Sequence, residues 1–555
     1  MPRSKPVAER AVPEQEESQF SDDLVIVVRL DVRLHDKRKW RPGVELPLIH
    51  AMDDRSLLEV TSEFSFVHPN MESVLRTIPV LLVAVVLLAF VRFLLDRKNG
   101  YTRGLPLPPG PKGWPVIGNM LNMTASQPWI AYRNLAIECG DIIYFQVLGQ
   151  PLLVLGNAAL VSEFFEKRSA NTVGQDKNYG IMPYGQQWRQ HRRLFWQHFN
   201  VRAVSAYQQT QTDTTRKFLL KLLQDPSQLV EHIRYAFLAT ILKVLVGIDV
   251  SDNGDNQYSG HIDAALEGFS QGLMPGKFLV GLLPFLRFVP SWVPGAGFQN
   301  TFARWREASA ALRHGPFEHV KDAMERGDAP ESVLAKLLSR VPDESGIWGA
   351  SAEEVEEIIK NIGFVGIEGG AETTFSAVQS AFLAMSLHPS VQKKVQTELD
   401  AVVGPHRLPE FADQASLVYV SALCKEALRW QNVTPMGVPH RTTADDELEG
   451  YFVPAGTLVS ANVWACMHDP AVFEDPDEFR PERFIRNGKL DVSARDPSAF
   501  AFGFGRRICP GRHFAEAGLF IIVASVLHVF DITPPLDEQG RPIEITPGQT
   551  DGIIS

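Results

Sequence analysis

The pattern of hydrophobic and polar positions predicts a mostly helical molecule with a few short strands. From Leu160 onward, apolar residues recur mainly at the spacing of amphipathic helices. Two alternating runs, residues 142–147 and 152–155, flank Gly149-Gln150 and predict a β-hairpin. Further short β-segments are expected near Leu448 to Val459.

One helix is predicted to be unusually long, from Ser351 to Leu387. Ser351 and Glu354 have the spacing of a capping box, and Pro389 ends the pattern. Three glycines in its middle, Gly366, Gly369 and Gly370, cost about 1 kcal/mol each relative to alanine. That cost requires a reason, and small residues let another group approach the helix backbone closely.

An apolar stretch precedes the helical part of the chain. Residues 77–91 carry no charge, and Phe93-Leu94-Leu95 extends the stretch past Arg92. At about 1.5 Å per residue, a helix over residues 77–95 spans roughly 28 Å, close to a bilayer's hydrocarbon thickness. A cleaved signal peptide is the alternative, but Met71-Glu72-Ser73 is not a basic leader. We expect a retained membrane anchor over residues 71–98. Basic residues follow it and predict a cytosolic C-terminal side: Arg92, Arg97, Lys98 and Arg103.

The segments around this anchor have different compositions. Residues 1–70 mix acidic stretches with Arg and Pro. They are either a genuine N-terminal extension or an upstream stretch wrongly included in a protein that begins at Met71. We favour the second alternative and expect this segment to be disordered. Residues 99–111 are proline-rich and predict a stiff linker.

Composition narrows the class of protein. Hydrophobic residues make up 45% of the 555 residues, which is typical of a globular core, and the net charge of −11 argues against a general nucleic-acid role. The four cysteines are far apart and lack the spacing of a metal pair or a disulfide framework: Cys139, Cys424, Cys466 and Cys509.

Cys509 stands in a loop that suits a thiolate ligand. Gly505 and Gly511 flank it, Arg507 lies two residues before it, and an apolar run begins at Arg512. Glycines let backbone N–H groups approach the sulfur, and the N-terminus of a following helix stabilises its negative charge. A buried structural cysteine is the commoner role of a lone cysteine, but F-x-x-G-x-R-x-C-x-G is a specific spacing.

This loop and four further motifs resemble the cytochrome P-450 family over roughly Leu107 to the C-terminus. Each motif alone is weak, whereas the ordered set is specific. The four are Trp188-Arg189-Gln190-His191-Arg192, Gly369-Gly370-Ala371-Glu372-Thr373-Thr374, the E-x-x-R of Glu426 to Arg429, and Phe479-Arg480-Pro481-Glu482-Arg483-Phe484.

The resemblance implies a cytochrome P-450 fold, a large α-rich domain with a small β-rich lobe over residues 112–555, behind an N-terminal transmembrane helix. It implies haem b with Cys509 as the axial thiolate, which favours O–O cleavage. Glu372 and Thr373 are the expected proton relay beside the iron. The remaining expected cofactor-binding residues are Phe502 and the propionate partners Trp188, Arg192, His440 and Arg507, with Arg441 as the alternative to His440.

The resemblance also implies a buried ion network of Glu426, Arg429 and Arg483 behind the haem. We expect this network to be structural, since an unpaired buried charge is strongly destabilising. Four arginines should lie on the thiolate side, either as a docking patch for an acidic reductase or as solvated charges: Arg189, Arg193, Arg506 and Arg512.

The expected function is that of a reductase-dependent monooxygenase of the endoplasmic reticulum membrane. Its expected partners are NADPH-cytochrome P-450 reductase, membrane lipid and an apolar small molecule, with no nucleic acid. The motif details resemble fungal members that serve secondary metabolism, where terpenoids or polyketides are oxidised. The Pro- and Trp-rich residues 279–298 are either an ordinary packed loop or a segment that dips into the bilayer.

Two alternatives remain open. A haem-thiolate isomerase or peroxide-using enzyme is one, although such members often lose the acid–alcohol pair. A non-catalytic relative is the other, because two segments are short compared with the family pattern: residues 170–181 and the C-terminus.

Overall fold

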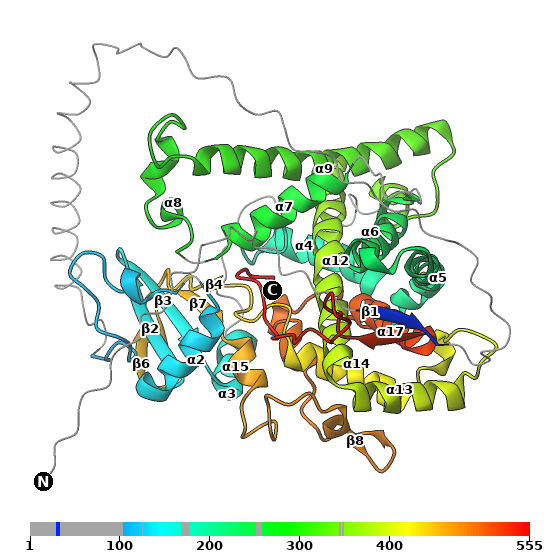
Figure 1. Ribbon diagram of the computed structural model, residues 1–555. Coiled ribbons are helices and arrows are strands. Elements are labelled where there is room, and N and C mark those ends of the chain that lie inside the picture. Colours follow the sequence, from blue (N-terminus) through cyan, green and yellow to red (C-terminus); the bar gives the residue numbers. More distant parts are fainter. Residues whose placement is uncertain are drawn as a thin grey trace, which may run out of the picture.

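The computed structural model describes residues 29–33 and 104–554, apart from residues 125, 168–177, 251–257, 275, 343–345, 347 and 348. A large helical part lies beside a smaller part that holds most of the strands (Figure 1). The predicted anchor, residues 71–98, and most of the short segment 170–181 lie outside the described residues.

Helices make up most of the described chain. The α-helices are α2 (Pro128–Cys139), α3 (Ala158–Ser162), α4 (Gln186–Phe199), α5 (Gln208–Gln224), α6 (Leu229–Val246), α7 (Ser259–Gly272), α8 (Leu279–Leu282), α9 (Phe298–Arg326), α10 (Val333–Leu338), α12 (Ala352–Leu387), α13 (Pro389–Val402), α14 (Val418–Trp430), α15 (Val463–Met467), α16 (Ser498–Ala501) and α17 (Arg512–Val529). Short 3₁₀ turns are η1 (Met120–Asn122), η3 (Ala203–Tyr207), η4 (Pro226–Gln228), η5 (Pro284–Phe288), η6 (Phe411–Asp413), η7 (Pro481–Phe484) and η8 (Gly505–Arg507), and η2 (Glu163–Lys167) is a π turn.

The strands are short. They are β1 (Arg29–Val32), β2 (Ile142–Val147), β3 (Gln150–Leu155), β4 (His440–Arg441), β5 (Asp446–Leu448), β6 (Tyr451–Val453), β7 (Leu458–Ala461), β8 (Ile485–Arg486), β9 (Lys489–Leu490) and β10 (Phe530–Thr533).

The main sheet has the order β2-β3-β7-β4, with β3 and β7 parallel and the other pairs antiparallel. The predicted hairpin is confirmed as β2 and β3. Its turn residues, Leu148 and Gly149, have φ values of +50° and +85°, the left-handed geometry that two-residue hairpin loops require.

The proline-rich stretch before the hairpin is bound to the β-rich part. The carbonyl oxygen of Pro109 accepts a hydrogen bond from the N–H of Tyr144, and that of Pro106 accepts one from Phe452, both at 2.8 Å. A Cβ on Gly110 would lie 1.9 Å from the carbonyl oxygen of Tyr144, so only glycine fits there. Residues 106–110 are therefore held against two strands, β2 and β6.

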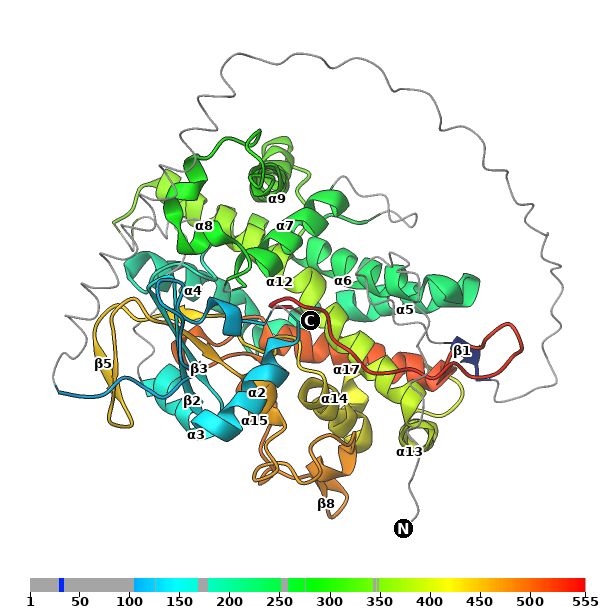
Figure 2. The same cartoon turned by 60° about the vertical axis from the view of Figure 1, so that its left-hand side comes forward.

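The long predicted helix is confirmed as α12, which runs through the middle of the molecule in two views (Figures 1 and 2). Its N-cap Ser351 and Glu354 form the expected capping box. Its first half packs with α4, α6, α9 and α10 in one apolar core, and its second half packs with α5, α13, α14 and α17 in another. The glycine-rich middle of α12 lies at the end of the first core, which includes Ile367 and Ala371.

Strand β1 pairs antiparallel with β10, Arg29 opposite Thr533 and Val32 opposite Phe530. The next residue, Arg33, donates from its backbone N–H to the carbonyl oxygen of Val529 at 2.8 Å. The expectation of a disordered extension over residues 1–70 therefore does not hold for residues 29–33. Residues 1–28 and 34–70 lie outside the described part.

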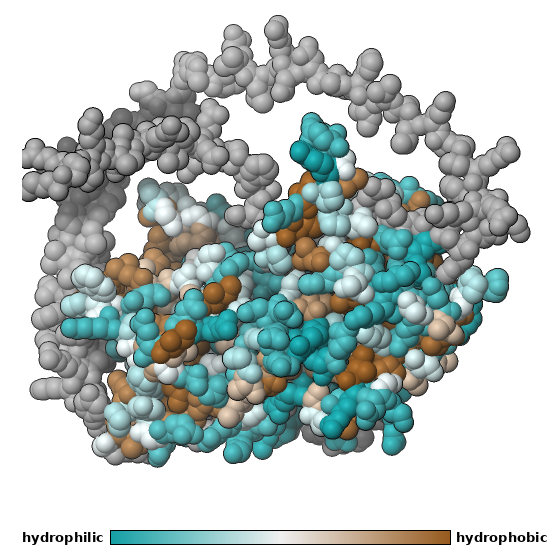
Figure 3. Space-filling model, turned by 60° about the horizontal axis from the view of Figure 1, so that its bottom comes forward, coloured by the Kyte–Doolittle hydropathy of each residue, from teal (hydrophilic) through white to brown (hydrophobic). Residues whose placement is uncertain are grey.

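The surface of the described residues is that of a globular protein. Figure 3 shows the molecule turned so that the lower side of Figure 1 comes forward. On this face hydrophilic side chains predominate, and apolar side chains form separate groups. Among the described residues, one helix, α17, is long and apolar enough to cross a membrane, and 61% of it is buried inside the molecule.

Candidate active site

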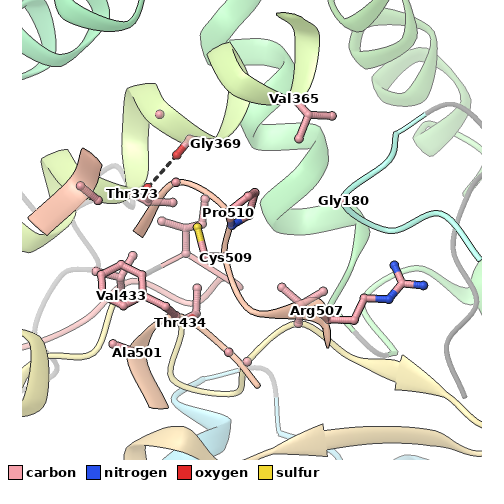
Figure 4. A pocket seen from close by; sticks show the side chains of 18 of the residues that line it. Gly180, Val365, Gly369, Thr373, Val433, Thr434, Ala501, Arg507, Cys509 and Pro510 are labelled. Carbon is pink, nitrogen blue, oxygen red and sulfur yellow. Dashed lines mark hydrogen bonds between the residues drawn. The ribbon is translucent and has the colours of Figure 1, made fainter. Parts of the chain in front are cut away.

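A cavity of about 330 Å³ lies between α12 and the loop before α17. Thr373 of α12 and Cys509 of the loop both line it (Figure 4). Much of the remaining lining is aromatic or aliphatic, with contributions from α4, α6, α7 and the segment around Val438. The cavity is thus an apolar space with one sulfur in its wall.

The loop geometry fixes the position of Cys509. Its backbone N–H donates to the carbonyl oxygen of Phe502 at 2.7 Å, and α17 begins three residues later, at Arg512. Gly505 has a φ of +54°, and a Cβ there would lie 2.7 Å from the carbonyl oxygen of Phe165. Glycine is required at Gly505 because this turn passes so close to another backbone segment.

Opposing effects act on the pKa of the Cys509 thiol. Burial raises it, whereas the N–H groups of Gly511 and Arg512 and the charges of Arg192 and Arg512 lower it. These are the groups that stabilise a thiolate once a metal binds the sulfur.

The other three cysteines, all within the described residues, do not line the cavity. Burial raises the pKa values of Cys424 and Cys466 to about 12, and Cys139 lies at the end of α2. The structure therefore leaves Cys509 as the candidate ligand of the four.

Arg507 forms a site for an anion at the edge of the cavity. Its Nε and Nη2 atoms are buried and have no hydrogen-bond partner among the described residues. Burial and the nearby Arg192 lower its pKa to about 10. The guanidinium lies 4.8 Å from the ring centre of buried Trp188, and its side chain extends away from Cys509 (Figure 4). A buried cation without a partner is costly, so this site fits a carboxylate from a bound group.

His440, in β4, lines the cavity, and its neighbour Arg441 does not. Burial, together with the charge of Arg507, lowers the pKa of His440 to about 3, which keeps the ring neutral. A neutral imidazole can donate one hydrogen bond to an anion. This placement favours His440 over Arg441 as the expected partner.

Thr373 lines the cavity, as expected for a member of a proton relay. Its hydroxyl donates to the carbonyl oxygen of Gly369 at 2.7 Å (Figure 4), and α12 continues unbroken through this point. The hydroxyl oxygen still has lone pairs on the cavity side, so Thr373 can accept and pass on a proton there.

Glu372 is placed differently from the expectation. It does not line the cavity, and its Oε1 lies 3.7 Å from Nη2 of Arg234. Burial raises the pKa of Glu372, and the charge of Arg234 opposes that rise. The expected acid–alcohol pair is therefore separated here, because Thr373 faces the cavity and Glu372 faces α6.

The glycines of α12 serve two purposes. A Cβ on Gly366 would lie 2.7 Å from Leu245, and one on Gly370 would lie 2.8 Å from Ile241, so both let α6 pack closely. A Cβ on Gly369 would meet nothing within 4 Å. All three glycines line the cavity, and of the three only Gly369 also has open space where a side chain would stand.

An acid that sequence reasoning missed, Glu368, lines the cavity and is 5% exposed. Burial raises its pKa to about 8, against one hydrogen bond from Asn178. The sequence does contain a signal for Glu368, because this acid follows the apolar run from Ile362 to Ile367 in a helix expected to be buried. An acid in such a run is a candidate functional group.

The structure brings Glu426, Arg429 and Arg483 together. Arg429 donates to both carboxylate oxygens of Glu426, at 2.7 and 2.9 Å, and Arg483 donates to one at 3.1 Å. The side chains of Glu426 and Arg429 are fully buried. Removing one member of such a network costs about 3–5 kcal/mol because a charge is left unpaired.

Two of the four arginines expected near the thiolate side lie together. The guanidinium groups of Arg189 and Arg506 lie 5.6 and 5.3 Å from the ring centre of Tyr184, and both arginines are exposed. Arg193 is exposed, and Arg512 donates to His513 at 3.2 Å.

The model of the cytochrome P450 family matches residues 108–553. The chain belongs to the cytochrome P450 family. The cytochrome P450 monooxygenase COX2 of Coprinopsis cinerea is 41% identical over 458 residues, 80% of this chain and 86% of the relative. COX1 of the same fungus is 37% identical over 494 residues, 85% of this chain and 94% of the relative. Tryptamine 4-monooxygenase of Psilocybe cyanescens is 34% identical over 493 residues, 86% of this chain and 95% of the relative.

The predicted family, fold and enzyme class are thereby confirmed: this P450 is a monooxygenase with the mostly helical P450 fold. Its cofactor is haem with a cysteine thiolate as axial ligand, and Cys509 is the cysteine whose loop matches that role. The unpartnered guanidinium of Arg507 and the open space at Gly369 fit such a cofactor. When bound, the haem supplies the iron at which O₂ is activated.

Proposed function

We propose that this P450 inserts one oxygen atom of O₂ into a largely apolar small molecule of fungal secondary metabolism, using electrons from NADPH-cytochrome P-450 reductase. The balanced reaction takes RH, O₂, NADPH and a proton to ROH, water and NADP⁺. The observation that carries the proposal is the position of Cys509, in a cavity with largely apolar walls and opposite a helix that presents Thr373. Terpenoids and polyketides are the expected substrate classes.

The proposal includes attachment to the endoplasmic reticulum membrane with the catalytic domain in the cytosol. The uncharged run over residues 77–91 and the basic residues after it support this. Large apolar side chains are exposed on and just after η5, which favours lipid contact over an ordinary packed loop: Phe285 (51%), Phe288 (73%) and Trp292 (76%). Arg189 and Arg506 support docking of an acidic reductase.

The test is the difference spectrum of the reduced protein with carbon monoxide. We expect wild type and the variants Cys139→Ala, Cys424→Ala and Cys466→Ala to give the thiolate-type band, and Cys509→Ala to lose it. Retention of this band in Cys509→Ala contradicts the assignment of the ligand.

The electron source is tested on the same preparations. Wild type with NADPH and a reductase should consume O₂ and oxidise a substrate, and it should not need added hydrogen peroxide. Turnover with peroxide alone would instead support the peroxide-using alternative.

A further inference from the structure

Glu368 is the one acidic side chain that α12 presents to the cavity among the described residues. It is 5% exposed, and its Oε2 accepts a hydrogen bond from Nδ2 of Asn178 at 2.7 Å. No other hydrogen bond or ion pair reaches it from the described residues. Oε1 therefore has no hydrogen-bond partner among the described residues, in a wall that is otherwise largely apolar.

The amide of Asn178 has a fixed orientation. Its Oδ1 accepts the backbone N–H of Gly180 at 2.9 Å, so the NH₂ group must be the side that faces Glu368. A Cβ on Gly180 would lie 3.8 Å from Cγ1 of Val365, which puts this turn against α12 one turn before Glu368 (Figure 4). Asn178 thus stabilises Glu368 as an acceptor.

The other titratable groups of the cavity do not neutralise this acid. Tyr179, His440, Arg507, Cys509 and Glu516 line it, but burial and the Asn178 hydrogen bond are what set the pKa of Glu368. Glu372, one turn further along α12, pairs with Arg234 outside the cavity.

We propose that Glu368, held by Asn178, recognises a protonated amine of the substrate, whose N–H donates to Oε1. A buried carboxylate is stabilised best by a cation that also donates a hydrogen bond, because the ion pair offsets the loss of hydration. A neutral hydroxyl group offers no such charge. The substrate is then an apolar molecule that carries one basic nitrogen. This inference rests on the proposed function, since it specifies the substrate of the same site.

The test compares amines with matched hydrocarbons on the ferric holoprotein. The probes are N,N-dimethyl-ω-phenylalkylamines with two to five methylene groups, which are protonated at pH 7, each paired with the hydrocarbon in which CH replaces N. We choose tertiary amines because their nitrogen coordinates to iron less readily than that of primary amines. Binding is measured by calorimetry. We expect at least one amine to bind about tenfold more tightly than its isostere.

Glu368→Gln should abolish this preference while keeping the carbon monoxide band, since it retains the size of the side chain. Glu516→Gln is the matched control: Glu516 also lines the cavity, but it is bound to Ser498 and His513. This control should keep the preference.

Amine binding should also release protons. Glu368, with a pKa of about 8, is mostly protonated at pH 7, and a bound cation lowers that pKa, so close to one proton should leave per amine bound. Calorimetry in buffers of different ionisation enthalpy measures this release, which Glu368→Gln should lack.

The inference is overturned if no amine of the series is preferred by wild type, or if Glu368→Gln keeps the preference. Neither result affects the carbon monoxide band or NADPH-dependent turnover, so failure of this inference is distinguishable from failure of the proposed function.

Discussion

Of the two members of the expected proton relay, Thr373 lines the cavity and Glu372 does not. The hydroxyl of Thr373 donates to Gly369 within the helix, and its lone pairs remain for a ligand or water in the cavity. Glu372 is turned toward Arg234 instead. We therefore expect Thr373 to be the member of the pair that acts directly.

We expect Thr373→Ala to bind haem normally, because Cys509 lies on a separate loop. It should form less product and more hydrogen peroxide per NADPH consumed, since protons reach the reduced oxygen in the wrong sequence or place. General acid–base catalysis contributes on the order of 10²–10⁴-fold to rates, so we expect the loss of coupling to be large. Product, peroxide and NADPH are measured together.

Thr373→Ser, which keeps the hydroxyl, should restore most of the coupling. Unchanged coupling in Thr373→Ala would mean that the hydroxyl serves helix packing alone.

Cys509, Arg507 and Thr373, to which local sequence motifs pointed, all line the cavity. Glu372 does not, and the motif could not reveal this, because which side of a helix an acid occupies depends on a partner far away in the sequence, here Arg234. Glu368 could have been found from its position after an apolar run, but its partner Asn178, 190 residues distant, could not.

At the scale of elements, the contact between α6 and α12 determines where the distal wall of the cavity lies. Gly366 and Gly370 remove the side chains that would separate the two helices at Leu245 and Ile241. The sequence showed that glycines inside a helix are costly and need an explanation, but periodicity does not reveal which neighbour a helix face meets. The explanation is the close packing of α12 against α6.

Gly370→Ala should therefore lower stability, although alanine is the better helix former by about 1 kcal/mol. The added Cβ would lie 2.8 Å from Ile241, and overpacking of this kind costs about 1–3 kcal/mol. The measurement is the midpoint of thermal unfolding of the holoprotein.

Gly260→Ala, in α7, is the matched control, since a Cβ there meets nothing within 4 Å and Gly260 does not line the cavity. Its midpoint should stay the same or rise. Equal destabilisation by both changes would show that close packing on α6 does not explain Gly370.

At the scale of the whole molecule, Arg33 joins the first described segment to the last core helix. Its Nη2 lies 2.8 Å from Oδ2 of Asp400, and its Nη1 donates to the carbonyl oxygens of Leu527 and His528 at 3.3 and 3.4 Å. These carbonyl groups belong to the C-terminal end of α17, where a cation is favourable. The side chain is only 11% exposed.

We expect Arg33→Ala to destabilise the full-length protein by roughly 1–3 kcal/mol, the usual range for hydrogen bonds to a charged group. Arg541→Ala is the control, because Arg541 makes an equally short contact with Asp537 but is 73% exposed, where such pairs contribute about 0–1 kcal/mol. Thermal midpoints of the two variants are compared with wild type. Equal midpoints for Arg33→Ala and wild type would mean that β1 does not hold to β10 in solution.

The pairing of β1 with β10 has a consequence for membrane sidedness. Residues 29–33 and 104–554 belong to one folded body when the two strands pair, so both must lie in the same compartment. A single membrane crossing by residues 71–98 would put them in opposite compartments. The paired strand and the single crossing therefore exclude each other within one molecule. A chain that starts at Met71 lacks β1, can cross the membrane once, and leaves that edge of β10 open. In a chain that keeps β1 paired, the polypeptide must return to the side of the membrane on which residues 29–33 lie. The choice of starting methionine thus decides the topology of the protein as well as its length.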